Sequence, residues 1–370
     1  MEEGLTYDDI LLLPSYTDFK RRDVTLTTML HPNITLKLPV VSAPMDTVTE
    51  DAMATKLAQV GGLGIIHRNL TIESQTQMVK NVKTTSVTDT ASAAVDMNGS
   101  LLVGAAVGTG EDFEERVRNL AEAKTDCIVI DSGHGHTKFM IDAIKRIKDS
   151  YPDIPIMAGN IATFDGAKAL IDAGVDMLRV GMGPGSICTT RIITGMGVPQ
   201  VTAVMEAVRA AANSSVVVIA DGGIKQIGDM AKALALGAHG VMLGSLFARY
   251  EESPGEIVEK NGKKYKQYRG MGSVAAMKKG GAERYGQSRD TEEKKLIAEG
   301  VESYVELKGT VTEFLYQISG SLKSSLYYLG SRNLQEFMIK AKFIKISNAA
   351  LLESHPHSIN ITNTGGNYFE

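Results

Sequence analysis

Short runs of mostly apolar residues recur along the chain, bounded by glycine, aspartate, asparagine or serine. Near-continuous apolar character over so short a run is typical of a strand that is covered on both faces. We therefore predict eight such strands. They lie at residues 39–45, 62–66, 101–107, 127–132, 155–160, 177–183, 216–223 and 240–245.

Helical patterns follow most of these runs. Residues 137–150 place apolar side chains at Met140, Ile144 and Ile147 with basic residues between them, and 163–173, 200–212 and 227–236 behave alike. Eight strands alternating with helices predict an α/β fold, a closed (β/α)8 barrel of the TIM type. An open doubly wound sheet is the alternative, which the lack of a Gly-x-Gly-x-x-Gly motif opening a helix disfavours.

Three stretches interrupt this alternation within what we predict to be a single domain over residues 1–370. A helix at 73–82 leads into the polar segment 83–100, predicted to be a short linker. Residues 253–310 are rich in lysine, glycine and glutamate and predict a mobile flap after the eighth strand. The run 311–329 would then be the last barrel helix, and 358–370 a flexible tail.

Composition narrows the function classes. The chain carries a formal net charge of −4, with 22% charged and 43% hydrophobic residues, as globular domains do. That charge disfavours nucleic acid as the main partner, and no apolar run is long enough for a membrane helix. The first residues have no signal-peptide pattern, and two cysteines cannot form a disulfide framework. These features predict a cytoplasmic protein.

Ligands of such barrels bind at the carboxyl ends of the strands. Gly222-Gly223 and Gly244-Ser245 follow the seventh and eighth predicted strands, and their backbone N–H groups would lie close together. This is the usual place for a phosphate in the fold, although two tight turns would give the same pattern. Asp221 would repel a phosphate and is better suited to accept hydrogen bonds from sugar hydroxyls.

Cys188 is the candidate nucleophile. A lone cysteine is more often a small buried apolar residue. Cys188, however, lies in a glycine-rich loop after the sixth predicted strand, next to Thr189, Thr190 and Arg191, where a cationic setting would favour the thiolate. Cys127 opens a strand and is predicted to be structural.

His134 and His136 form a His-x-His at a strand end, as in some zinc sites. No obvious third ligand accompanies them, so a loop role is the better interpretation.

Several motifs follow one another along the chain: Leu5-Thr6-Tyr7-Asp8-Asp9, residues 43–50 (APMDTVTE), 183–191 (GPGSICTTR), 195–200 (GMGVPQ), 220–224 (ADGGI) and 268–273 (YRGMGS). In sequence and in order, from about residue 5 to about residue 357, the chain resembles the IMP dehydrogenase / GMP reductase family, in particular its dehydrogenases.

The resemblance implies a usually tetrameric barrel enzyme that oxidises IMP to XMP with NAD. Cys188 would attack C2 of the purine and form a covalent thioimidate, which water then hydrolyses. Arg284 and Tyr285, on a mobile flap with glycine hinges, would activate that water with help from Thr190. Most members carry a paired cystathionine-synthase-like (CBS) regulatory module where this chain has only residues 83–100.

The resemblance also assigns binding residues. The implied IMP ligands are Ala43, Met45, Ser186, Asp221, Gly222, Gly223, Gly244, Ser245, Tyr268, Gly270, Met271, Gly272 and Glu299. The implied cofactor contacts are Asp131, Ser132, Asn160 and Gly181. A monovalent cation, K⁺ in this family, would be bound by Gly183, Gly185 and Cys188, with Glu353, Ser354 and His355 of a neighbouring subunit.

Two departures and two rivals accompany this hypothesis. Gly286 stands where the family has an aromatic residue after Arg-Tyr, and Glu302-Ser303-Tyr304 replaces the commoner Glu-Gly-Arg. A GMP reductase, which uses NADPH and releases ammonia, lacks the Arg-Tyr pair and has Met-Ser-Ser where this chain has Met271-Gly272-Ser273. The other rival is a purine-nucleotide-binding protein without turnover.

Overall fold

The apolar runs form the strands predicted for them. The structure is a computed structural model that describes residues 2–363, 367 and 368. Eight parallel strands close into a barrel in the order β10-β11-β4-β5-β6-β7-β8-β9, which confirms the predicted fold class. They are β4 (Val40–Ser42), β5 (Leu63–Ile66), β6 (Val103–Val107), β7 (Cys127–Asp131), β8 (Ile156–Ile161), β9 (Met177–Val180), β10 (Val217–Asp221) and β11 (Gly240–Leu243).

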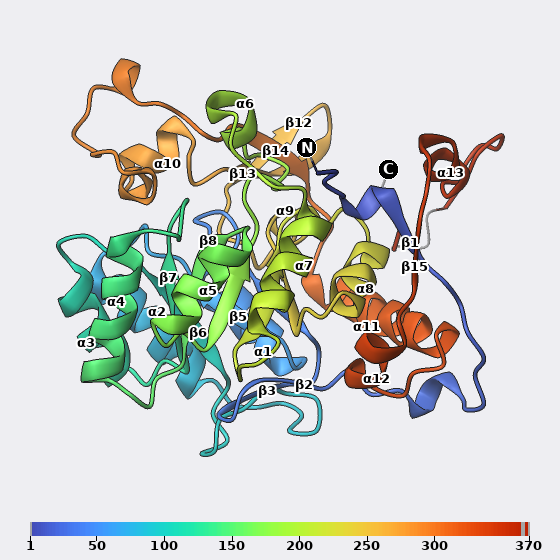
Figure 1. Cartoon of the computed structure of the whole chain (residues 1–370). Coiled ribbons are helices and arrows are strands. Elements are labelled where there is room, and N and C mark those ends of the chain that lie inside the picture. Colours follow the sequence, from blue (N-terminus) through green and yellow to red (C-terminus); the bar gives the residue numbers. More distant parts are fainter. Residues whose placement is uncertain (1, 364–366, 369–370) are drawn as a thin grey trace.

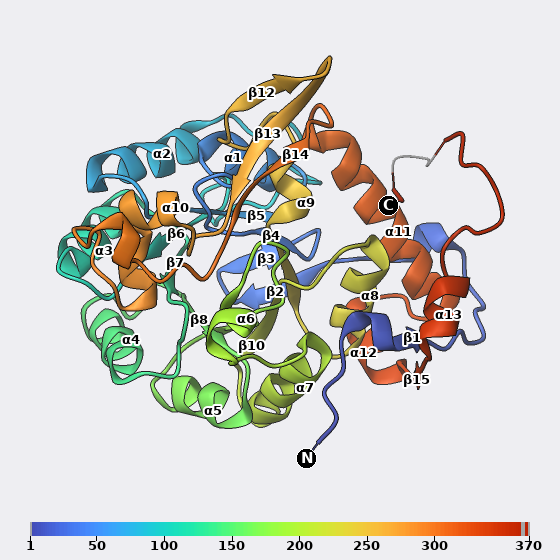
Figure 2. The ribbon, with the colours of Figure 1, turned by 90° about the horizontal axis from the view of Figure 1, so that it is seen from above.

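Helices surround the barrel (Figure 2). Several begin where the sequence supplies a cap: the hydroxyls of Thr71, Thr137 and Thr163 each accept a hydrogen bond from a backbone N–H three residues on. In the described part of the chain no helix has the length and hydropathy to cross a membrane. The surrounding helices are α1 (Asp51–Gln59), α2 (Ile72–Thr84), α3 (Phe113–Glu122), α4 (Lys138–Ser150), α5 (Phe164–Asp172), α7 (Gln200–Ala211), α8 (Ile227–Ala235) and α11 (Val311–Tyr328).

The strands are apolar throughout because both of their faces are buried. In β4, Val40 packs among the helices and Val41 packs inside the barrel. The antiparallel hairpin β2 (Thr28–His31) and β3 (Ile34–Leu36) covers the amino-terminal end of the barrel, at the bottom of Figure 1. Its Leu30, Ile34 and Leu36 join the inner core. Only the carboxyl ends of the strands are left for a ligand site.

The segment 253–310 is more regular than the sequence predicted. It contains the antiparallel sheet β12-β13-β14, the helix α10 and two 3-10 helices, all above the rim of the barrel (Figure 1). Its mobility stays a prediction. The elements are β12 (Ile257–Lys260), β13 (Lys263–Arg269), β14 (Glu302–Glu306), α10 (Val274–Lys278), and the 3-10 helices Gly281–Tyr285 and Glu293–Lys295.

The remaining elements lie around the barrel ends. β1 (Ile10–Leu12) pairs with β15 (Phe343–Lys345), which joins the two ends of the chain. The predicted flexible tail 358–370 lies partly outside the described residues, and 358–363 contain neither helix nor strand. The other elements are the 3-10 helices Tyr7–Asp9 and Arg21–Asp23, α6 (Thr190–Thr194), α9 (Ser245–Ala248), α12 (Leu334–Lys340) and α13 (Asn348–Glu353).

The segment predicted as a linker, 83–100, begins inside α2 and is held by a partly buried ion cluster. The Lys83 ammonium lies 2.8 Å from the Asp96 carboxylate and 2.9 Å from that of Asp126, and it donates to the Leu101 carbonyl. Burial raises the pKa of Asp126 to about 6, and Lys83 opposes that rise. The cluster ties α2, the segment and the start of β7 together.

Replacing Lys83 with methionine keeps the aliphatic stem but leaves the partly buried carboxylates of Asp96 and Asp126 without their cation. We expect the free energy of unfolding to fall by about 1–3 kcal/mol, measured by urea denaturation at neutral pH. Lys80→Met, on an exposed position of the same helix, is the control and should leave stability nearly unchanged. Equal stability of the two variants would show that the cluster does not secure this segment.

Candidate active site

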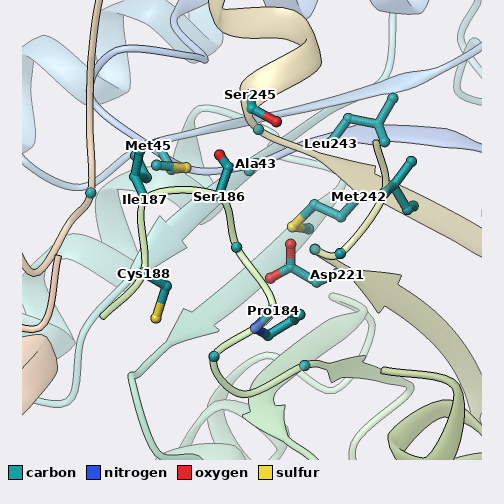
Figure 3. A pocket seen from close by; sticks show the side chains of 18 of the residues that line it. Ala43, Met45, Pro184, Ser186, Ile187, Cys188, Asp221, Met242, Leu243 and Ser245 are labelled. Carbon is teal, nitrogen blue, oxygen red and sulfur yellow. The ribbon is translucent and has the colours of Figure 1, made fainter. Parts of the chain in front are cut away.

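A cavity of about 840 Å³ opens at the carboxyl ends of the barrel strands. The loops after β4, β9, β10 and β11 build its floor, and residues of the 253–310 segment close it from above. Figure 3 shows Ser186 and Ser245 together at one end, with Asp221 beside Pro184. All thirteen residues predicted to bind the substrate line this cavity.

One end of the cavity is suited to an anion. Gly222 and Gly223 have φ angles of +87° and +76°, which L side chains rarely adopt. Tyr268 is buried, and its hydroxyl is hydrogen-bonded with Ser186 and Ser245; burial nevertheless raises its pKa to about 12, so it stays a neutral donor. Backbone turns and hydroxyls at one place form a polar cradle, and the neighbouring Asp221 carboxylate is paired with Arg179.

A buried charge network forms the floor. Arg179 donates from Nε to Asp221 Oδ2 at 2.8 Å and pairs with Asp131 through its other end. The Asn160 amide also donates to Asp221 Oδ2, at 2.8 Å. This fixes Asp221 at the edge of the cavity, where its carboxylate can meet a sugar hydroxyl.

The sequence analysis missed Arg179. The signal was present: a charged residue stands inside the apolar strand β9, at the inward position next but one to Met177. It is 3% exposed, and a buried arginine is nearly always paired. A charge at an inward strand position could therefore have been recognised as part of the site.

Cys188 lies on the loop after β9 and lines the cavity (Figure 3). Its thiol donates to Thr190 Oγ1 at 3.2 Å, and that hydroxyl donates to Glu299 Oε2 at 2.8 Å. A thiol, a hydroxyl and a carboxylate thus form a chain along which a proton can move. Cys127 is fully buried, and burial raises the pKa of its thiol, which agrees with a structural role.

Arg191 acts on the loop rather than on the cavity. Its guanidinium donates to the carbonyls of Met182 and Val198, which brings the two ends of the loop together. Burial lowers its pKa, and the charge of Cys188 opposes this effect. The cationic setting expected around Cys188 is therefore present, at the side of the loop.

The predicted Arg-Tyr pair reaches the cavity from the flap. The Arg284 guanidinium contacts the Asp131 carboxylate, and its carbonyl accepts a hydrogen bond of 3.0 Å from the N–H of Gly133. Burial lowers the pKa of Arg284, a change that Tyr285 opposes. Burial raises the pKa of Tyr285. Burial thus favours the neutral form of the Arg284 guanidinium, whereas the contact with the Asp131 carboxylate favours its charged form.

Gly286, one of the departures from the family pattern, ends the 3-10 helix that carries this pair. Its φ of +67° is left-handed, and its N–H donates to the Glu283 carbonyl. Among the described residues, no atom lies within 4 Å of a Cβ added there. The glycine therefore satisfies the turn, and no described residue packs against the position that a side chain would take.

The predicted cofactor residues divide into two groups. Asn160 and Gly181 line the cavity. Asp131 is buried beneath Arg179 and Arg284, and the Ser132 hydroxyl donates to the His134 carbonyl at 3.0 Å. Among the described residues, Asp131 Oδ2 and Asn160 Oδ1 are buried acceptors without a hydrogen-bond partner. Asp131, which does not line the cavity, could meet a ligand with hydroxyl donors only after Arg284 had moved away from it.

Four of the six residues predicted to bind the cation line the cavity. Gly183, Gly185 and Cys188 line the cavity, and Gly183 has a φ of +81°. His355 of the same chain lines it too, whereas Glu353 and Ser354, at the end of α13, do not.

The comparisons with known proteins agree with the geometry. The family model described as "IMP dehydrogenase / GMP reductase domain" matches residues 4–357. A Borreliella burgdorferi protein named inosine-5'-monophosphate dehydrogenase is 43% identical over 97% of this chain and 98% of its own. Proteins of the same name from Bacillus subtilis and Aquifex aeolicus are each 38% identical, over 99% and 100% of this chain and 98% of their own.

The lengths of these alignments differ. The B. subtilis and A. aeolicus alignments run over 481 and 484 positions, against the 370 residues of this chain. The B. burgdorferi alignment runs over only 394. The two longer relatives therefore contain internal residues that have no counterpart here.

Proposed function

Because the chain belongs to the IMP dehydrogenase / GMP reductase family, we propose that it oxidises IMP to XMP with NAD⁺ as the hydride acceptor. The observation that carries this proposal is Cys188, which lines the same cavity as the hydroxyl and glycine cradle and is hydrogen-bonded to Thr190. The three relatives reported above are named for this activity.

In the first step the Cys188 thiolate bonds to C2 of the purine, and the hydrogen on C2 leaves with its electron pair. When bound, NAD⁺ supplies the acceptor for that hydride, and Asp131 and Asn160 would hold its hydroxyls through their free acceptors. The proton of the thiol can pass to Thr190 and on towards Glu299. The product is a thioimidate between Cys188 and C2.

In the second step water attacks C2 and the C2–S bond breaks, which gives XMP and restores the thiol. Arg284 is the candidate base, because burial lowers its pKa and the flap places it in the cavity. Arg284 also contacts Asp131, which is needed for the cofactor in the first step. The flap and the dinucleotide would therefore occupy the space beside Asp131 one after the other, so that water enters only after the cofactor has left.

The rival GMP reductase reaction fits less well. A Cβ added to Gly272 would lie 2.7 Å from Cζ of Tyr285, so a serine at this position would collide with the flap tyrosine. The glycine and the Arg284-Tyr285 pair therefore belong together, and both are features of the dehydrogenase pattern. A binding protein without turnover gives no reason for Cys188, Thr190, Arg284 and Tyr285 to share one cavity.

A spectrophotometric assay separates the three hypotheses. IMP and NAD⁺ should give NADH, read by its absorbance, and GMP with NADPH should give no oxidation. NADPH oxidation with GMP would identify the reductase, and tight IMP binding without any turnover would identify the binding protein.

Potassium is the proposed cation. Backbone carbonyls of Gly183, Gly185 and Cys188 would hold it, and Glu353, Ser354 and His355 of a second subunit would complete the site. Replacing K⁺ by Li⁺ at constant ionic strength should lower turnover several-fold, because Li⁺ is smaller than K⁺ and carbonyl oxygens arranged for K⁺ coordinate it poorly. Unchanged turnover would count against a cation requirement.

From the resemblance to the family we also propose that the protein is a cytoplasmic homotetramer without the CBS module. Ile192, in α6, and Met196, just after that helix, are 85% and 66% exposed, as expected where a neighbouring subunit covers them. Light scattering of the purified protein measures the number of subunits.

A further inference from the structure

Arg68 is a buried cation outside the catalytic cavity. It follows β5, its side chain is 8% exposed, and it does not line the cavity. The carboxylates of Glu283 and Asp112 face it, and its Nη1 lies 3.6 Å from Glu283 Oε2. Glu283 directly precedes Arg284 in the flap, so the ion pair joins the barrel rim to the residue before the candidate base.

The loop after β6 leaves space for both partners of this pair. A Cβ added to Gly108 would lie 2.8 Å from Arg68 Nη1, and one added to Gly110 would lie 2.7 Å from Glu283 Oε2. Any larger residue at either position would displace one member of the pair. The rim is therefore shaped for a seated arginine and for the flap carboxylate that meets it.

Asn69, the next residue, contacts another part of the flap. Its amide donates to the Asp46 carboxylate at 3.0 Å and to the carbonyl of Ala276, in α10, at 3.4 Å. Asp46 in turn pairs with Arg269, the last residue of β13. The loop after β5 thus contacts flap residues on both sides of Gly280, namely Ala276 through Asn69 and Glu283 through Arg68.

The two partners differ in exposure, which decides how the contact acts. The Glu283 side chain is 54% exposed, so the pair alone adds little to stability. With the flap seated, the Arg68 side chain is 8% exposed, so the Glu283 carboxylate meets a cation that has lost most of its water. The contact therefore favours the seated flap over a flap that has moved away.

From these contacts we propose that Arg68 is a positioning residue that seats the flap, by holding Glu283, so that Arg284 and Tyr285 stand over the cavity for the hydrolytic step. The proposal rests on the proposed function. Arg68 touches no reacting atom and acts through the flap. Its positive charge also lowers the pKa of Arg284, in the direction that a base requires.

Kinetics of Arg68→Met test the proposal. The methionine keeps the buried stem and removes the charge. Steady-state turnover should fall about two- to fivefold, the shift that a partly exposed ion pair can supply, whereas the first burst of NADH, which reports hydride transfer, should keep its rate. Arg68→Lys should recover most of the turnover. Adding Glu283→Gln to Arg68→Met should cost little more, because both changes remove one contact.

Arg118→Met is the matched control, since Arg118 is 58% exposed on α3 and far along the chain from the flap. It should behave as the wild type does. Wild-type turnover in Arg68→Met, an equal loss of burst and turnover, or additive losses in the double variant would each overturn the proposal.

Limited trypsin digestion gives a readout that does not depend on the reaction. Cleavage at the flap lysines and arginines between 278 and 295 should be faster in Arg68→Met than in the wild type and the control, because the flap is less often seated. Unchanged cleavage would also overturn the proposal. If the wild type itself forms no NADH from IMP, the proposed function fails, and digestion still decides whether Arg68 seats the flap.

Discussion

Replacing Cys188 by alanine is expected to abolish NADH formation from IMP while IMP binding persists. The thiolate is the group that turns C2 into a hydride donor, and no other described residue of the cavity is a cysteine. We expect turnover to fall by about 10⁴-fold or more. The nucleotide affinity should change little, because the hydroxyls, glycines and Asp221 that hold the phosphate and sugar are untouched.

Calorimetric titration with IMP measures the affinity of the variant for the nucleotide, and the absorbance assay measures its turnover. Cys127→Ala, which removes the other thiol, is the control: it can lower stability because it opens space inside the barrel, but it should still turn over. Turnover retained by Cys188→Ala would remove the nucleophile from the account.

The second large effect is expected from Arg284→Ala. The first hydride transfer should survive, because Arg284 is not needed until the thioimidate is hydrolysed. The loss of a general base lowers the second step by about 10²–10⁴-fold. The enzyme should therefore release one burst of NADH, equal to the number of active sites, and then nearly stop.

Stopped-flow absorbance resolves the burst, and Arg289→Ala is the control because Arg289 is an exposed arginine of the same flap.

The pH dependence of the hydrolytic rate is a further check on Arg284. Burial lowers the pKa of Arg284, so its neutral form increases as the pH rises and the wild-type hydrolytic rate should rise with it. That rise should be lost in Arg284→Ala. A variant with no burst would place Arg284 in the first step instead.

The sequence was sufficient for the barrel and for most of the cavity. Strands such as β7 and β10 are buried on both faces, so their apolar runs stand out from the polar turns. The loops that follow them carry short polar motifs at strand ends, and a barrel brings those ends together. This is why the eight predicted substrate residues that stand at the ends of barrel strands or in the loops after them share one cavity. The other five lie in the flap and were predicted from the family resemblance.

Other parts carried a weaker signal. β13 (Lys263–Arg269) is half exposed and rich in lysine, so its pattern is that of a polar loop. α3 (Phe113–Glu122) has a narrow apolar face among charged residues. Arg179 and Arg68 act through burial and pairing, and both depend on which distant carboxylates the fold brings near. Local sequence patterns contain no such information.

Mass spectrometry of Cys188 tests the central claim most directly. Arg284→Ala mixed with IMP and NAD⁺ should be quenched in acid after the burst and digested. The account predicts that the peptide containing Cys188 is heavier by the mass of IMP less one hydride and one proton, and that the peptide containing Cys127 is unchanged. An unmodified Cys188 in an enzyme that has released its burst of NADH would contradict the account.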